Sequence, residues 1–212
     1  GAGCPSQVEY SVLVPYDSNA RAGYALASGA DVDGDGFNDL AIGGYGVGVD
    51  GDTVGAAWVA TSDYLSSAPS EVAVSGQWPL TTSTLIGTGG QYFVHGDVHN
   101  GQFGRSVALV PSLSSDGRAG LMVGAPLSSI SGTDLTGGAQ IYEFMVTDPV
   151  NYGLNQTPVA SFGGETWAVD ARLGEQVCAT AQNGSPLAVV GGYRADGVSV
   201  DNGAAYVLPL GP

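Results

Sequence analysis

The sequence predicts an all-β protein built from repeated units of four antiparallel strands. Two observations lead to this prediction: the chain contains 35 glycines among 212 residues, and short apolar runs recur at long, regular intervals. So much glycine disfavours a helical protein and is typical of many short strands joined by tight turns. A chain of this length forms one domain or one compact repeat array. We therefore expect residues 1–212 to form a single domain.

Three related segments organise the chain. Their anchoring glycines, Gly23, Gly104 and Gly174, lie 81 and 70 residues apart. After each glycine we expect a strand, a loop, an apolar strand that ends in glycine, a longer loop and a third strand. The predicted units span about residues 21–88, 102–164 and 172–208.

Further strand candidates supply a fourth strand for these units. STLIGT (83–88) and PVASFGG (158–164) each precede the next unit, and VEYSVLVP (8–15) stands in the same place before the first. Four antiparallel strands per repeat are the signature of propeller blades. Aromatic residues occupy equivalent third-strand positions and are expected to pack between blades: Trp58, Tyr142 and Tyr206.

One loop of the first unit, DVDGDGFND (31–39), carries four aspartates in nine residues. Carboxylates this close repel one another unless a cation or protons neutralise them. Acidic residues at positions 1, 3 and 5 with glycine at 6 form the pattern that wraps oxygen ligands around Ca²⁺. The loop is not an EF-hand, because position 12 is Ile42 instead of glutamate. The predicted Ca²⁺ ligands are Asp31, Asp33, Asp35, the backbone carbonyl of Phe37, and Asp39; the alternative is a merely polar turn.

Two motifs carry a family resemblance. Phe103-Gly104 and Gly124-Ala125-Pro126 resemble the two halves of an FG-GAP repeat, the blade unit of the integrin α-subunit β-propeller, and residues 31–39 resemble the calcium loops of that family. The resemblance implies an extracytoplasmic, calcium-stabilised, non-enzymatic module for adhesion or protein recognition. It implies no ligand-binding residues, because integrin ligand binding also draws on a partner subunit. The first and third units depart from the motif with Ala22-Gly23 and Leu173-Gly174.

The corresponding loops of the other two units lack the acidic pattern. Where the first unit has four aspartates, the second offers Ser112, Ser114, Asp116 and Gly120. One carboxylate does not hold Ca²⁺ alone, so we expect no ion there. The third unit shortens the loop to QNGSP and has no carboxylate. Only the first unit is predicted to bind the ion.

Three blades are too few to close a propeller ring, which needs four to eight. The sequence starts with a fourth-strand candidate (8–15) and ends after a third strand (203–208). A two-fold homodimer would form a six-blade ring in which each N-terminal strand completes the last blade of its partner. The rival explanation is that the chain is a piece of a longer array.

The charge balance limits the partners. The net charge is −15, with five arginines and no lysine, which argues against nucleic acid and anionic membranes because both need a basic patch. No apolar run is long enough to span a bilayer. The sequence contains no G-x-S-x-G, P-loop or HExxH motif. We therefore expect a protein that is not an enzyme, located outside the cell, at the cell surface or in the periplasm.

The two cysteines leave several readings open. Ala2-Gly3-Cys4 resembles the end of a bacterial lipoprotein processing site, so Cys4 could carry a lipid anchor in the precursor. A Cys4–Cys178 disulfide and two unremarkable thiols are the alternatives. Cys178 occupies the position of Ala27 and Ala108, which predicts a buried, inert thiol.

Other features suggest different functions. His95, Asp97 and His99 lie within five residues and could bind a transition metal, although a polar surface loop explains them equally simply. A carbohydrate-binding propeller is the alternative to protein recognition, with Tyr45, Trp78 and Tyr193 at sugar sites. A lyase or hydrolase with a propeller body is a third class, and resemblance of fold alone does not choose among them.

Overall fold

A computed structural model of the chain describes residues 12–15, 19–66, 77–80, 91–129, 136–148, 151–154, 157–163, 170–195 and 203–210. This part of the chain is all-β, apart from the five-residue helix α1 (Ser62–Ser66). Its three larger sheets are antiparallel, and none of them is closed.

The first sheet has four strands in the order β2-β3-β6-β8. These strands are Ala25–Ser28 (β2), Leu40–Gly44 (β3), Ala56–Ala60 (β6) and Gln91–His95 (β8). Strand β8 therefore holds the fourth place in this sheet, for which the sequence had predicted residues 83–88. The predicted strand 83–88 lies outside the described residues.

The second sheet has the order β9-β10-β11-β14. Its strands are Ser106–Val110 (β9), Gly120–Gly124 (β10), Gly138–Tyr142 (β11) and Ala160–Gly163 (β14). Strand β14 pairs with β11 and confirms the strand predicted within 158–164. Because both faces of this sheet are covered, β9 and β10 are buried along their whole length.

The third sheet has three strands in the order β15-β16-β17. They are Gln176–Gln182 (β15), Ser185–Gly192 (β16) and Ala204–Pro209 (β17). A two-residue turn joins β15 to β16, with positive φ at Asn183 (53°) and Gly184 (80°). Asn-Gly is the preferred pair for such a hairpin turn, since its twist matches that of the flanking strands.

Three two-stranded sheets complete the described part of the chain. They are β4 (Gly48–Val49) with β5 (Asp52–Thr53), β12 (Phe144–Asp148) with β13 (Asn151–Leu154), and β1 (Val12–Pro15) with β7 (Gln77–Leu80). Strand β1 runs parallel to β7 of the same chain. This partner differs from the predicted one, the last blade of a second copy; residues 8–11 lie outside the described part.

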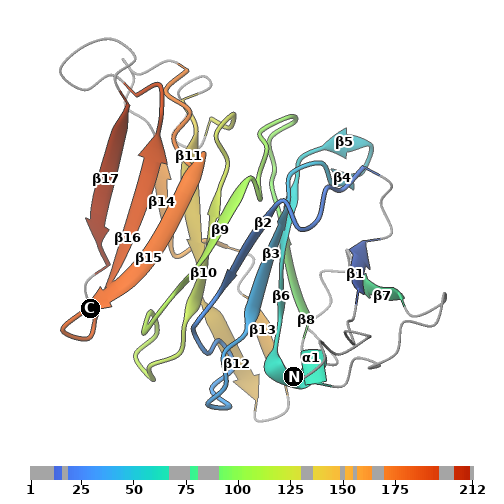
Figure 1. The fold of residues 1–212 in the computed structure, drawn as a ribbon, viewed down its shortest axis with the longest axis vertical. Helices are drawn as coiled ribbons and strands as arrows, with labels where there is room; N and C mark the ends of the chain where they lie inside the picture. Colours follow the sequence, from blue (N-terminus) through green and yellow to red (C-terminus); the bar gives the residue numbers. More distant parts are fainter. Residues whose placement is uncertain are drawn as a thin grey trace, which may run out of the picture.

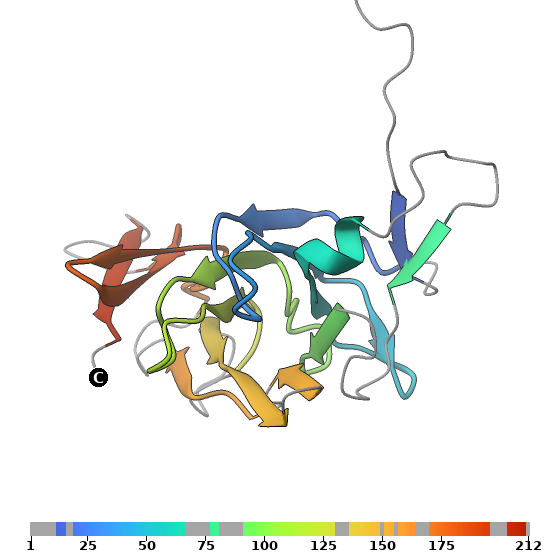
Figure 2. The same ribbon diagram turned by 90° about the horizontal axis from the view of Figure 1, so that it is seen from below.

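The three larger sheets lie side by side in sequence order, with the third sheet at one end (Figures 1 and 2). Their first strands are neighbours, because β9 contacts both β2 and β15. One hydrophobic cluster fills the space between the first two sheets and includes Tyr142, and a second fills the space between the last two and contacts Tyr206. These two aromatic residues pack between sheets, as predicted. For Trp58 the prediction is wrong within the described chain, because this residue pairs with Ile42 and is fully buried on the other face of the first sheet.

The same turn enters the first strand of each sheet. Arg21, Gln102 and Arg172 have φ between 55° and 58°, and the carbonyl of each accepts a hydrogen bond from the amide three residues later. The following glycines, Gly23, Gly104 and Gly174, donate to the carbonyls of Gly43, Gly124 and Gly191 in the second strands. The three units therefore share local geometry as well as sequence.

Glycines also form the joints between consecutive sheets. A Cβ on Gly43 would lie 2.2 Å from the Gly104 carbonyl oxygen, and one on Gly55 would lie 2.0 Å from that of Phe103. The next joint repeats this arrangement: Gly124 meets the Gly174 oxygen at 2.1 Å, and Gly137 meets the Leu173 oxygen at 2.4 Å. We call these two pairs and their counterparts in the third sheet, Gly191 and Gly203, the joint glycines. Only glycine permits so close an approach of one backbone to another.

Cys178 contradicts the prediction of a buried thiol, because it is a free and exposed cysteine. Its neighbours Val177 and Ala179 pack toward the second sheet. Side chains alternate along a strand, so Cys178 points to the opposite face of β15. Ala108 on β9 is buried because the third sheet covers that face, whereas no described residue covers the outer face of the third sheet at Cys178.

Candidate metal centre and ligand pocket

The acidic loop joins β2 to β3 at one end of the strands of the first sheet. Asp31 accepts hydrogen bonds from the amides of Gly34 (2.6 Å) and Gly36 (2.8 Å), and both glycines have positive φ. The amide of Ala119, in the corresponding loop of the second sheet, donates to the Asp31 carbonyl at 2.7 Å. The loop is therefore folded around its own carboxylate and is tied to the neighbouring sheet.

Three of the predicted ligands come together. Asp31, Asp33 and Asp39 each offer a carboxylate oxygen, and these oxygens all lie within 4.8 Å of one another. Asp39 is fully buried, and its two oxygens accept hydrogen bonds from the amides of Val32 (2.7 Å) and Ser62 (2.8 Å). Oxygen ligands at this spacing suit a hard divalent cation, so the cluster could hold a metal ion.

Asp35 and Phe37 lie in the same loop outside this cluster. The Asp35 carboxylate accepts hydrogen bonds from the Phe37 amide (2.7 Å) and from the Ser62 hydroxyl (2.6 Å). The Phe37 side chain is exposed. Ser62 begins α1, separated by one residue from the end of β6 at Ala60, and contacts two of the four aspartates; nothing in the sequence marks it as part of the site.

The electrostatics of the loop favour a cation. Burial raises the pKa of Asp39 to about 6, and the charges of Asp33 and Asp35 add to the rise. Burial and the neighbouring carboxylates of Asp35 and Asp31 also raise the pKa of Asp33. Both ionised forms are therefore disfavoured, mainly by burial and in part by the neighbouring carboxylates, and a bound cation would offset this.

The second sheet replaces the acidic cluster with an internal ion pair. The Arg118 guanidinium contacts the Asp116 carboxylate at 2.7–2.8 Å, and the Ser114 hydroxyl donates to the same carboxylate. The hydrogen bond from Arg118 is the main reason that the pKa of Asp116 lies well below its usual range. Arg118 also packs against the first loop, since its Cδ would lie 3.3 Å from a Cβ on Gly34. In this loop an arginine neutralises the carboxylate.

The two histidines do not converge. His95 Nδ1 lies 2.8 Å from the Gly96 carbonyl oxygen, and His99 Nδ1 lies 3.1 Å from an Asp52 carboxylate oxygen. Within the described ranges, the one group of three or more candidate metal-binding side chains is that of Asp31, Asp33 and Asp39.

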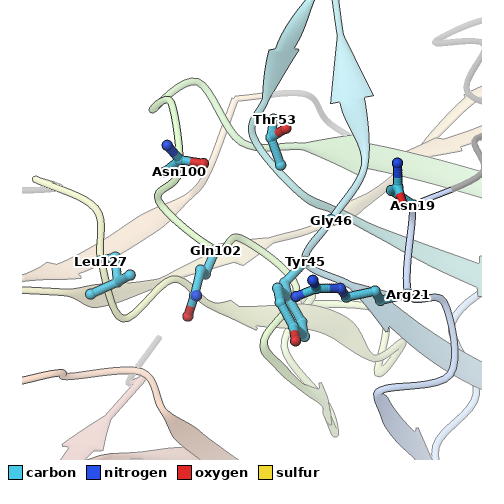
Figure 3. A pocket seen from close by; sticks show the side chains of 8 residues that line it. All are labelled: Asn19, Arg21, Tyr45, Gly46, Thr53, Asn100, Gln102 and Leu127. Carbon is cyan, nitrogen blue, oxygen red and sulfur yellow. The ribbon is translucent and has the colours of Figure 1, made fainter.

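A pocket of about 460 Å³ lies at the opposite ends of the strands of the first two sheets, beside the β4–β5 hairpin (Figure 3). Its lining includes Arg21, Tyr45, Thr53, Asn100, Gln102 and Leu127. The Arg21 guanidinium lies over the Tyr45 ring, 4.7 Å from its centroid, and Arg105 lies 5.1 Å from the same centroid.

The backbone of this pocket is unusual. Arg21, Asn100 and Gln102 all have φ between 55° and 58°. For Arg21 and Gln102 this conformation belongs to the turn that enters the first strand of each sheet, since Arg172 has it too; Asn100 adds a further left-handed residue beside that turn. Sequence reasoning had considered Tyr45 alone among these residues, because the lining comes from several separate segments. Trp78, another predicted sugar contact, lies in β7, whose side chains are outside the described part.

No protein-family model matches the sequence, and no curated protein sequence matches it. No helix in the described ranges is both long enough and apolar enough to cross a membrane.

Proposed function

We propose that the loop 31–39 binds Ca²⁺ and that the ion stabilises a propeller-type recognition module. The observation that carries the proposal is the convergence of Asp31, Asp33 and Asp39 on one point, with Asp39 buried. The D-x-D-x-D-G-x-x-D spacing adds Asp35 and the Phe37 carbonyl as further oxygen ligands. The bound ion would supply positive charge to four aspartates and so hold the loop against the second sheet.

Calorimetric titration with CaCl₂ tests this proposal. For a site of extracellular type we expect a Kd on the order of 10⁻⁴ to 10⁻³ M, or tighter if the loop is rigid. Asp33→Ala should abolish the binding. Asp50→Asn is the matched control, because it removes one negative charge from an exposed loop at the opposite ends of the strands. No heat of binding in the wild-type chain, or equal binding by Asp33→Ala, would rule out this site.

The resemblance to FG-GAP repeats supports recognition of an extracellular protein as the function of the module. An acidic chain without lysine and a calcium loop both suit an extracytoplasmic location, where Ca²⁺ is abundant. In this proposal the protein is not an enzyme. Binding to a panel of extracellular matrix and cell-surface proteins, in Ca²⁺ and in chelator, tests it. Calcium-independent catalytic turnover of any substrate would contradict it.

Glycan binding is a second candidate, supported by the pocket in Figure 3. Asn100 and Gln102 offer amides, and Arg21, which lies over the Tyr45 ring, forms no ion pair with any described residue. This combination suits a sugar that carries a carboxylate. A glycan array should then show acidic glycans whose binding is lost in Tyr45→Leu and Arg21→Asn. Phe37→Leu, which removes an exposed aromatic ring in the β2–β3 loop away from this pocket, is the matched control.

A further inference from the structure

The turns that enter the first strands of the three larger sheets differ at two side-chain positions. We call them the first, second and third entry turns. The later position holds arginine or glutamine with φ between 55° and 58°: Arg21, Gln102 and Arg172. The earlier position, two residues before, holds an amide in the first two turns and a carboxylate in the third: Asn19, Asn100 and Asp170. The third turn alone therefore brings its own negative charge.

In the third entry turn, this carboxylate is held by two arginines. The Arg172 Nε donates a hydrogen bond to one oxygen of Asp170 at 3.0 Å, and the Arg194 guanidinium contacts the other oxygen. Hydrogen bonds of this charged kind are the usual means by which arginine recognises a carboxylate. The third turn is therefore a carboxylate site that the chain fills with its own side chain.

The first entry turn has the arginine without the carboxylate. Arg21 forms no ion pair with any described residue, whereas each of the other four arginines pairs with an aspartate or a glutamate. Carboxylates are not scarce, because the chain has 20 acidic residues and five arginines. The Arg21 guanidinium stacks on Tyr45, and stacking by the face leaves the N–H groups at the edge able to donate. No described group balances the charge of this arginine.

An open space lies beside Arg21. The pocket of about 460 Å³ is lined by Arg21 from the first entry turn and by Asn100 and Gln102 from the second (Figure 3). Gly46 also lines it and follows Gly-Gly-Tyr in the sequence, as Arg194 does in the third sheet. The second arginine of the third turn is thus replaced here by a residue without a side chain. Since amides both donate and accept hydrogen bonds, this pocket suits a molecule with one carboxylate and several hydroxyls.

We propose that the entry turn is a carboxylate-binding turn, filled by Asp170 in the third sheet and open at Arg21 to an external sugar acid in the first. It rests on the glycan-binding candidate function and adds to it a position for the carboxylate and a second, latent site. By analogy with Asp170, the ligand carboxylate lies against the Arg21 guanidinium. The ring hydroxyls then face Asn100 and Gln102.

The second entry turn supplies the residues for both test substitutions. Arg21→Gln copies Gln102 and removes the guanidinium from the first turn. Asp170→Asn copies Asn100 and releases the two arginines of the third turn. Gln102 and Asn100 have φ of 58° and 56° in their own turn, so each substitution introduces a residue that this backbone already accepts. Circular dichroism should show that both variants are folded.

Titration with D-glucuronate, followed by the Nε–Hε signals of the five arginines in ¹⁵N NMR spectra, tests the proposal. D-glucose is the neutral counterpart, and about 0.15 M salt screens the repulsion between an anion and a chain of net charge −15. In the wild type we expect the Arg21 signal to shift and the Arg172 signal to stay. In Asp170→Asn both signals should shift. Arg21→Gln should weaken binding by at least about tenfold, and D-glucose should shift neither signal.

Asp116→Asn is the matched control for the gain of a site. It removes the same charge and also breaks an ion pair with an arginine. The Arg118 side chain is only 12% exposed, so its release should create no binding site. If Asp116→Asn gains binding as Asp170→Asn does, the gain follows from net charge and not from the entry turn, and the proposal fails.

Further outcomes would overturn the proposal in distinguishable ways. If the wild type binds D-glucuronate at Arg21 but Asp170→Asn gains no site, the glycan-binding candidate stands and the entry-turn assignment fails. If the wild type binds no D-glucuronate, both fail. Equal binding of sulfate would refute a site made for carboxylate. Asp17 lies outside the described residues, so Asp17→Asn is measured too: binding that appears only in this variant would give Arg21 a partner in its own chain.

Discussion

The Arg105 guanidinium at the start of β9 lies 2.6 Å from the Glu175 carboxylate at the start of β15, and it stacks on Tyr24 from the first sheet, 4.4 Å from the ring centroid. Two hydrogen bonds, from Nε and Nη2, reach the same carboxylate oxygen. One side chain thus contacts both neighbouring sheets. Both partners are mostly buried, which protects the pair from screening by solvent.

We expect Glu175→Gln to destabilise the chain by about 1–3 kcal/mol, because it removes a charged hydrogen-bond acceptor from a mostly buried arginine. Chemical denaturation measures the loss. Glu143→Gln is the control, since Glu143 forms no ion pair with any described residue. Equal stability of the two variants would mean that the ion pair contributes nothing to the joint.

The variants Asp39→Ala and Asp33→Ala should differ in stability in the absence of calcium. Asp39→Ala leaves the amides of Val32 and Ser62 without their acceptor, at about 1–3 kcal/mol each if they stay buried. Asp33→Ala should cost little in EDTA, since it relieves repulsion from Asp31 and Asp35. Thermal melts in EDTA should therefore show a large loss for the first variant alone. Parallel losses for the two variants would contradict this division of roles.

The stabilisation by calcium should depend on pH. Burial raises the pKa of Asp39 in the ion-free chain to about 6, whereas an unperturbed aspartate titrates near 3.9. Between these values the folded chain holds a proton that the unfolded chain does not, so the ion-free fold becomes more stable as the pH falls through about 6 toward about 4.

Because Ca²⁺ must displace that proton, the rise in melting temperature that it causes should shrink below about pH 6. Paired melts in Ca²⁺ and in EDTA, from about pH 8 to about pH 5, measure the difference. A calcium-induced shift that stays constant across this range would show that Asp39 does not titrate in competition with the ion.

Gly124→Ala should unfold or severely weaken the chain, because its Cβ would lie 2.1 Å from the Gly174 oxygen in the middle of the sheet stack. Overpacking of this kind typically costs about 1–3 kcal/mol, and backbone atoms relax less readily than side chains. Gly191→Ala, at the equivalent glycine of the third sheet, isolates the effect of the following sheet, because a Cβ there meets nothing closer than 3.5 Å. If both variants melt at the same temperature as the wild type, the internal joint is looser than described.

Cys178 tests whether the outer face of the third sheet is open to solvent. Its thiol is exposed, so a small alkylating reagent should modify it readily in the folded single chain. The modification rate in native buffer should be close to that in denaturant, whereas a thiol buried like Ala108 would react far more slowly in native buffer. A thiol that reacts only after denaturation would show that this face of the third sheet is covered.

The sequence was informative where the determining contacts are local. The loop 31–39 could be predicted from spacing alone, because Asp31, Asp33 and Asp39 are brought together by turns within nine residues. The repeated sequence pattern likewise predicted three strands in each larger sheet, because these strands follow one another within each unit. Ser62 could not be found, since its contact with Asp35 spans 27 residues and depends on where β6 ends.

The exposure of Cys178 was mispredicted because burial at that position is a property of the next sheet. Alignment with Ala27 and Ala108 correctly placed the residue on a first strand. It could not tell whether another described sheet covers the outward face of that strand. The fourth strand of the first sheet was placed too early for a related reason: 83–88 and 91–95 are both apolar runs, and only pairing with β6 distinguishes them.

The bridges between sheets have a consequence for the order of folding. The Phe103 amide donates to the Val54 carbonyl and the Leu173 amide to the Thr136 carbonyl, so each new first strand bonds to a turn that precedes the third strand of the sheet before it. During synthesis, that earlier turn leaves the ribosome first. Each sheet can therefore serve as a template for the next one, and we expect the chain to gain structure from its N-terminal sheet toward its C-terminal sheet.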